Sequence, residues 1–324
     1  MKQIRNYSLL ASAMLTFALT SCNNDEVETI PYEGPVLAQV TAGIDGALTR
    51  ASDTSWDQND AIGITCRNTE NETNYDNKKY VTASGNGTFT HYNATVEDLA
   101  GGIFFQGTGD VSFFAYYPFT GTDGTLPGTN NGIISGSTQK QVTNQKSLDY
   151  LYAAASTTYA TPTISFTGND KFKHKMARLK LVLQTDANAG FSVEDVKSGT
   201  YTLGGLKHDG TFNVIEGKAK TTPDASPVAN WSVSTNCPYA DANNQRTYTM
   251  FLYPQTVSGP LPFTATISSQ NYNNTADIKF TDNELSSGNS YTFTITIKKT
   301  GLAVSSCTIE GWGTEVTGSG NAGM

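Results

Sequence analysis

The side chains best suited to chemistry are few in this sequence, and most of them are widely separated. Four cysteines stand at positions 22, 66, 237 and 307, and three histidines at positions 91, 174 and 208. These spacings do not match a zinc site, a CxxC redox pair or a disulfide framework. The sequence also contains no HExxH, GxSxG or phosphate-binding glycine loop. We therefore expect no catalytic residues, no metal and no cofactor, which leaves Cys22 and Arg50 as the positions of chemical interest.

Cys22 ends a segment that is typical of an export signal. Two basic residues precede an apolar run over residues 9–19, which is short for a membrane span. The run ends in LTSC, which resembles the lipobox of bacterial lipoproteins, and the acidic stretch NNDEVE that follows resembles a surface-export tag. We expect residues 1–21 to be a lipoprotein signal peptide and Cys22 to carry a lipid such as palmitate, which would anchor the chain in the outer membrane. An ordinary signal peptide with a chance cysteine is the alternative.

The other three cysteines are an odd number once Cys22 is set aside. We expect each to be a small buried side chain. A single disulfide among Cys66, Cys237 and Cys307 stays open, and the sequence does not indicate which pair would form it.

Arg50 stands alone in GALTRASDTSW, among small polar residues. It follows a strand-like segment and precedes the first stretch that reads as a packed domain. Two interpretations fit this position: a solvated loop arginine, or a site where a protease cuts the chain.

The segment before Arg50 alternates between apolar and polar residues with the period of a half-buried strand. We predict a strand of the first domain over residues 36–46. The side chains expected on its buried face are Val36, Ala38, Val40, Ala42 and Ile44.

Similar short strands follow along the rest of the chain. Residues 111–119 are aromatic-rich, residues 148–156 are ambiguous between a strand and a helical turn, and residues 172–184 alternate. The pattern restarts after TDANAG at 185–190, which is the best candidate for a domain boundary. The second half then shows short strands separated by Gly, Pro and Asn turns, which is typical of an antiparallel sandwich or barrel. With 324 residues the chain is long enough for two such domains.

The net charge of −8 disfavours nucleic acid as a partner, because a polyanion would be repelled. The aromatic runs would serve either as sandwich core or as a platform on which sugars stack, and core is the simpler interpretation.

Taken together, these segments resemble the fimbrillin family, the subunits of type V pili. The residues that carry the resemblance are the lipobox at Cys22, LTRA at 48–51, WDQNDAIGI at 56–64, FFAYYP at 113–118, FKHKMARLKLVL at 172–183, TMFLYPQ at 249–255 and CTIEGW at 307–312. The family implies an all-β fold with two antiparallel β-sandwich domains of transthyretin-like topology. We place these domains at residues 51–187 and 188–324.

The resemblance also implies a function and a maturation route. The chain would be a structural pilus subunit that serves in cell adhesion and is not an enzyme. Arg50 matches the position at which an arginine-specific protease cuts the family's precursors, with Arg50–Ala51 as the bond. Removal of residues 22–50 would open an apolar groove, and a strand from another subunit would fill it. The surface ligand of the pilus is unknown.

The C-terminal segment departs from the family's pattern. In polymer-forming members this segment supplies the donor strand, but here Trp312 and Val316 are the main candidate anchors and the rest is rich in Gly, Ser and Asn. Stalk, tip and accessory roles therefore stay open. The alternative function is a glycan-binding surface lipoprotein that does not polymerise, and an enzyme comes third.

Overall fold

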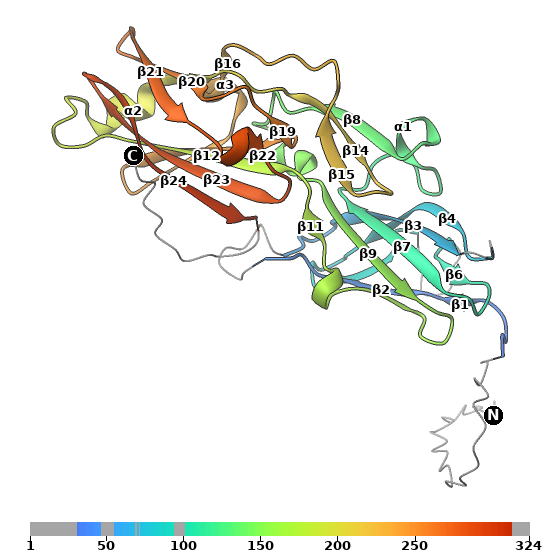
Figure 1. Cartoon of the computed structure of the whole chain (residues 1–324). Coiled ribbons are helices and arrows are strands. Elements are labelled where there is room, and N and C mark those ends of the chain that lie inside the picture. The colour runs from blue at the N-terminus through green and yellow to red at the C-terminus, as the bar shows by residue number, and fades with distance from the viewer. Residues whose placement is uncertain (1–30, 47–54, 69, 71, 94–100, 313–324) are drawn as a thin grey trace, which may run out of the picture. The chain divides into compact units, whose positions relative to one another are not determined.

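The structure is a computed structural model, and it describes residues 31–46, 55–68, 70, 72–93 and 101–312 (Figure 1). These residues form many strands joined by turns and a few short helices, so the predicted all-β class is confirmed. None of the helices in this part of the chain is long and apolar enough to cross a membrane. The sheets pack as β-sandwiches, and the transthyretin-like strand order stays a prediction.

The first half of the chain builds an eight-stranded sheet with the order β10-β2-β5-β4-β3-β7-β9-β11. All neighbours pair antiparallel except β2 and β10, which run parallel. β10 also contacts β9, so the sheet folds back on itself around a core. The strands are β2 (Gln39–Ala42), β3 (Ala61–Asn68), β4 (Tyr75–Val81), β5 (Thr88–His91), β7 (Val111–Tyr117), β9 (Leu151–Thr157), β10 (Thr163–Phe166) and β11 (Lys173–His174). A separate pair joins β1 (Val36–Leu37) to β6 (Phe104–Phe105).

The alternation of side chains explains why these segments are strands. In β7, Val111, Phe113 and Ala115 are fully buried, whereas Ser112 and Phe114 between them are half-buried. Most of the ambiguous stretch at 148–156 forms β9, and its first residue ends a 3₁₀ turn, η1 (Gln145–Leu148). Two further short elements are α1 (Pro127–Asn130) and η2 (Gly168–Asp170).

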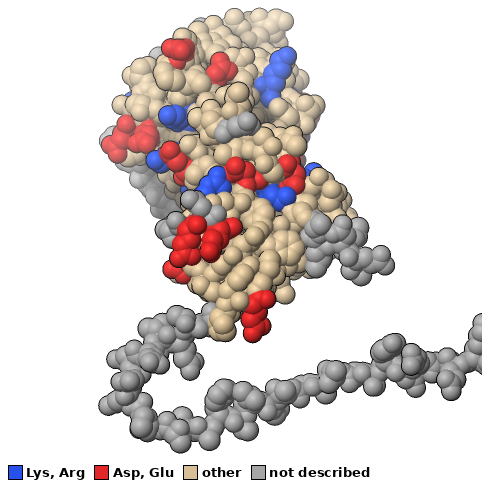
Figure 2. Space-filling model, turned by 90° about the vertical axis from the view of Figure 1, so that its right-hand side faces the viewer, with Lys and Arg blue, Asp and Glu red and all other residues tan. Residues whose placement is uncertain are grey.

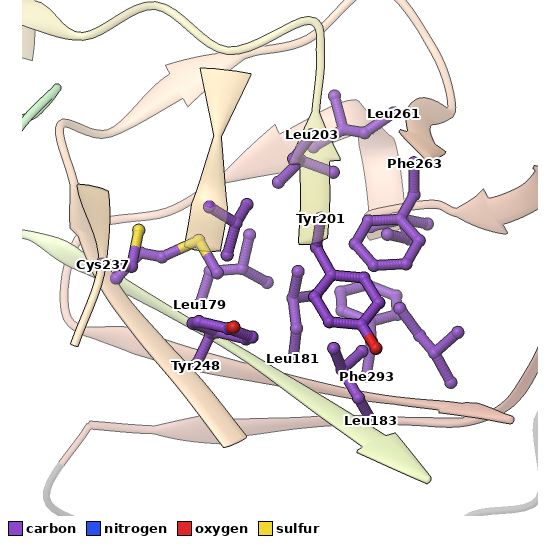
Figure 3. Close-up of a cluster of buried hydrophobic side chains, with 14 of the residues drawn as sticks. Leu179, Leu181, Leu183, Tyr201, Leu203, Cys237, Tyr248, Leu261, Phe263 and Phe293 are labelled. Atoms are coloured by element: carbon purple, nitrogen blue, oxygen red, sulfur yellow. The ribbon is translucent and has the colours of Figure 1, made fainter. Parts of the chain in front are cut away.

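The second half of the chain forms a sandwich of two sheets around a separate core. One sheet has the order β17-β18-β12-β23-β24, and the other β16-β13-β20-β21. Figure 3 shows how Leu179, Leu181 and Leu183 from one sheet meet Tyr201 and Phe263 from the other. The first sheet contains β12 (Ala177–Gln184), β17 (Tyr239–Ala242), β18 (Gln245–Leu252), β23 (Asn289–Lys298) and β24 (Gly301–Gly311). The second contains β13 (Thr200–Leu203), β16 (Trp231–Ser232), β20 (Leu261–Ile267) and β21 (Gln270–Ile278).

Short elements complete this sandwich. α2 begins after Ser192, whose side chain accepts from the Asp195 backbone while the Asp195 carboxylate accepts from the Ser192 backbone, as in a capping box. The remaining short elements are α2 (Val193–Ser198), α3 (Val233–Asn236), the pair β19 (Gln255–Thr256) and β22 (Glu284–Leu285), and η3 (Thr281–Asn283).

A third cluster of buried side chains joins the two halves. Some of its side chains come from a three-stranded sheet of β8 (Ile133–Ser137), β14 (Asp209–Asn213) and β15 (Lys218–Thr221). The buried Gln141 side chain donates to the Phe251 carbonyl at 2.7 Å and accepts from the Phe251 N–H at 2.8 Å. Its amide therefore takes the place of a missing strand partner for β18.

The change from the first sheet to the second comes earlier than the predicted boundary at 185–190. β11 pairs with β9 in the first sheet, whereas β12 pairs with β18 and β23 in the second. Lys175 and Met176 make the crossing. Sequence alternation shows which side chains are buried, but it does not show against which sheet, so one alternating run concealed two strands.

Charged groups are mixed on the surface shown in Figure 2. Lys and Arg side chains there lie between Asp and Glu side chains rather than in one continuous basic patch. That face therefore offers no extended positive field to a polyanion.

Candidate functional site: the strand at residues 36–45 and its groove

Residues 36–45 form an extended segment, called here the strand at 36–45, which contains β1, β2 and an isolated bridge from Ile44 to Phe172. Neighbouring segments hold β2 along both edges. In β2, Val40 lies opposite Ile164 of β10 on one side and opposite Phe89 of β5 on the other. Backbone hydrogen bonds of 2.7–2.9 Å extend the pairing, with donors first: Ala38 to Ile103, Gln39 to Pro162, Ala42 to Gly87, Gly43 to Phe166 and Asp45 to Phe172. The segment therefore lies inside the sheet rather than at its edge.

The side chains of this strand alternate between the core and the surface. Val36 is half-buried, and the exposed fractions of the next four inward side chains are small: Ala38 5%, Val40 2%, Ala42 5% and Ile44 8%. These side chains belong to the same core as Phe89, Ile164 and Phe166. β1 ends at Leu37 and β2 begins at Gln39, but the alternation of buried and exposed side chains continues through Ala38 between them.

Two residues that the sequence reasoning did not single out, Trp56 and Gly87, pack against the Ala42 carbonyl. The Trp56 Nε1–H donates to the Ala42 carbonyl at 2.9 Å, and its ring meets Phe89 and Phe172 edge-on at 5.1 Å. Gly87 has φ +84°, and a Cβ there would lie 2.6 Å from the same carbonyl. A lone Trp directly after a polar loop was the available sequence signal for Trp56, whereas Gly87 had none.

The strand at 36–45 also connects β10 to the rest of the sheet. β10 lies at the end of the strand order, and β2 is its ladder partner among the described strands. Loss of β2 would therefore leave β10 and β5 with unpaired edges that face each other across the vacated space.

Four of the predicted site residues lie outside the described residues: Cys22, Arg50, Ala51 and Val316. Residues 47–54, which include Arg50, are not described; the described residues stop at Gly46 and resume at Ser55. Trp56, which is 7% exposed, follows at once.

Trp312 ends the described part of the C-terminal segment and is 5% exposed. Its ring stacks flat on His174, with 4.1 Å between centroids and 7° between planes, and lies 4.7 Å from the Phe251 ring. The Arg178 guanidinium lies 4.8 Å from the Trp312 ring centroid. These partners come from β11, β18 and β12, so Trp312 fixes the end of β24 where the two halves meet.

The three described cysteines and His208 lie wholly or partly inside the packed structure. Cys66 and Cys237 are buried, Cys307 is half-buried, and all three are free thiols. Burial raises the pKa of Cys66 to about 12 and lowers the pKa of His208 to about 4. The described residues contain no group of three His, Cys, Asp or Glu side chains that could hold a metal ion.

A pocket of about 200 Å³ beside Ile44 contains one of the described contacts between a histidine and a carboxylate. His174 Nδ1 lies 2.8 Å from Asp149 Oδ1, while the ring itself is held flat against Trp312. Lys146 Nζ in the same pocket bridges Asp57 and Asp60 at 2.6 and 2.8 Å. These polar groups therefore serve one another as ion pairs and hydrogen bonds of the fold.

Comparison with known proteins gives a consistent result. Residues 49–312 match the family model described as fimbrillin-like. A Bacteroides uniformis protein described as a candidate fimbrium subunit, Fim1C, is 27% identical over 99% of this chain and 99% of its own length. The crystal structure of a candidate cell adhesion protein from Bacteroides ovatus has a TM-score of 0.70 and 25% identity, covering 86% of this chain and 99% of that one. A second candidate adhesion protein, from Bacteroides uniformis, shares the fold with a TM-score of 0.67 at 22% identity, covering 86% of this chain and 100% of that one.

Proposed function

Since the chain belongs to the fimbrillin-like family, we propose that it is a structural subunit of a surface pilus that assembles by strand exchange at residues 36–45. The observation that carries this proposal is the position of that strand, which is paired along both edges and buried on one face. Its removal would expose two sheet edges and an apolar groove together, and an extended strand of another subunit supplies what both require.

Maturation in this proposal has two steps. The lipid on Cys22 first holds the precursor in the outer membrane, and an arginine-specific protease then cuts the Arg50–Ala51 bond. The cut separates residues 22–50, which contain the strand at 36–45, from the remainder of the chain. The same event releases the subunit from its lipid and makes the groove available.

The donor strand of this chain would have to come from beyond Trp312. Residues 301–311 already pair with β23 over the length of β24, and Trp312 is packed among side chains of both halves. Because those contacts hold Trp312 within its own chain, Trp312 is poorly suited to insert into another subunit as an anchor. Val316 would then lead the donor segment, and the glycines around it fill a groove poorly.

The glycan-binding alternative gains little support from the described surface. A sugar platform requires aromatic rings that lie together on one face. Each exposed tyrosine instead has its ring contact with a less exposed side chain: Tyr32 with Tyr159, Tyr92 with His91, and Tyr239 with Tyr248.

Substitution of the cleavage site tests the proposed function. Arg50→Ala should leave the lipidated precursor at the membrane and abolish polymer, and mass spectrometry should no longer find a subunit that begins at Ala51. Arg50→Lys is the matched control, because it keeps the positive charge but not the side chain that an arginine-specific protease reads. Normal assembly of Arg50→Ala would overturn the processing step.

A further inference from the structure

The strand at 36–45 leaves part of its own groove unfilled. A pocket of about 220 Å³ opens beside Ala38 and Val40, and its other walls include Tyr80, Phe89 and His91. The pocket lies where two strands separate. β2 and β5 pair at Val40 and Phe89, and the same register would place Ala38 opposite His91, but the ladder does not extend that far.

The walls of this pocket are suited to an apolar side chain. The Tyr80 hydroxyl accepts from the Ile103 N–H at 2.8 Å, and His91 Nε2 lies 3.3 Å from Asp123 Oδ1. Both polar groups are thus engaged with the fold, and an entering group would meet mainly the ring faces and methyl groups. Ala38 contributes one methyl group to a space that could hold several more carbons.

We propose that this pocket is a recognition site for a large aliphatic side chain on the incoming strand, and that the strand comes from a different pilus subunit. The inference rests on the proposed strand exchange. The resident strand, with Ala38 at this position, is under-packed and is therefore displaced by a strand that carries Leu, Ile or Met there. Exchange is favourable because the replacing strand removes apolar surface from water that the resident strand leaves exposed.

The sequence of this chain argues against a second copy as the donor. Beyond Trp312, the larger apolar side chains are Val316 and Met324. If Val316 takes the position of Ala38 with the segment running in the direction of the resident strand, Gly318 and Gly320 fall at two of the next three buried positions. The same holds if Met324 takes that position with the segment running in the opposite direction. A glycine there has no side chain to occupy the space that valine, alanine or isoleucine fills in the resident strand.

A second alanine on the same face, Ala42, provides a comparison for the space beside Ala38. Ala42 does not line this pocket, and it belongs to the packed core that contains Trp56 and Phe89. A large side chain at position 42 would overpack the groove, whereas the same side chain at position 38 would fill it. Ala38→Leu and Ala42→Leu are therefore a matched pair with opposite expected signs.

Synthetic peptides of residues 34–46 test the inference on the full-length precursor after cleavage by an arginine-specific protease. One peptide has the native sequence, two carry Ala38→Leu or Ala38→Asn, and a further peptide has the sequence of residues 313–324. We expect the Ala38→Leu peptide to inhibit polymer formation at a concentration on the order of tenfold below that of the native peptide. Asn has the size of Leu without its apolar character, so the Ala38→Asn peptide should be weaker than both.

The outcomes separate this inference from the proposed function. If the native peptide inhibits but the Ala38→Leu peptide is no better, the pocket does not recognise a side chain and the inference is overturned. If the peptide of residues 313–324 inhibits better than the Ala38→Leu peptide, the donor is a second copy and the assignment to a different subunit is overturned. If no peptide binds the cleaved chain, cleavage does not open the groove, and the proposed function fails together with the inference.

The intact precursor gives an independent check. Ala38→Leu should raise the melting temperature of the precursor by a few degrees and slow release of the cleaved segment. Ala42→Leu should lower the melting temperature. A lower melting temperature for both variants would show that position 38 has no room, and would overturn the inference.

Discussion

The strand at residues 36–45 and the strand at residues 301–311 both add to existing sheets, but the structure holds them in different ways. The first is short, uses Ala38 and Ala42 at buried positions, and is held by neighbours on both edges. The second is long, pairs with β23 on one edge and ends in Trp312, whose ring contacts β11, β12 and β18. The first is a short stretch with two alanines at buried positions, whereas the second combines a long ladder with one large packed side chain, so the first is the better suited to exchange and the second to permanence.

The largest expected effect comes from removing the Trp312 ring. Trp312→Ala should lower the free energy of unfolding by about 4 kcal/mol, because it leaves a cavity between His174 and Phe251. Denaturant titration of the full-length chain measures this loss. Trp312→Phe keeps an apolar ring and should lose clearly less. A loss near zero for Trp312→Ala would mean that the C-terminal strand is held by its ladder alone.

Lowering the pH should reduce the folding stability of the chain through His208. Its folded pKa of about 4 lies below the ordinary value of 6.5, because burial disfavours the charged form. As pH falls from 6.5 towards 4, the unfolded chain gains a proton at this site that the folded chain does not. Stability therefore falls by up to about 3 kcal/mol over that window.

The comparison with His208→Gln isolates this contribution from other titrating groups. The difference in unfolding free energy between wild type and variant should change with pH between 6.5 and 4, and should be flat above pH 7. A difference that is independent of pH would show that His208 is not the group that titrates.

Substitution of Val40 tests the strand at residues 36–45 in the same comparison. Val40→Ala should cost the intact precursor about 2 kcal/mol, because the side chain is 2% exposed in the core with Phe89. After cleavage and exchange the substitution should have no effect, since the strand that carries it has left. Denaturation of the precursor and of the assembled polymer provides the two measurements. An equal loss in both would mean that the strand stays in place.

The smallest effect concerns a glycine that faces this strand. Gly87→Ala should destabilise the precursor by about 1–2 kcal/mol, because φ is +84° and the new Cβ would meet the Ala42 carbonyl at 2.6 Å. Gly124→Ala is the matched control, since φ there is +80° and no atom lies within 4 Å of the added Cβ. If the two variants lose the same free energy of unfolding, the contact with the Ala42 carbonyl contributes nothing to the effect at Gly87.

Local alternation made much of the fold predictable. It indicated the strand at 36–46 and the buried faces of β7 and β12, because a period of two reports directly on burial. It did not indicate that residues 172–184 cross from one sheet to the other at Lys175 and Met176. That choice depends on contacts between strands far apart in the chain, which no local pattern encodes.

The site was partly predictable for the same reason. The inward residues of the strand followed from their spacing, whereas the parallel pairing with β10 and the hydrogen bond from Trp56 depend on tertiary structure. The pocket beside Ala38 had no sequence signal at all. It arises where β2 and β5 diverge, and a small side chain on its own does not reveal an empty space.

Pairing along both edges of residues 36–45 also has a mechanical consequence for a filament. Ladder hydrogen bonds lie across the strand direction, so tension along the strand loads them in shear rather than peeling them one after another. A strand seated between β10 and β5 meets such resistance on two sides at once. If, as proposed, a strand of another subunit occupies this groove, that strand would form a joint that bears tension along the fibre, while sideways removal would still need to break only a few bonds at a time.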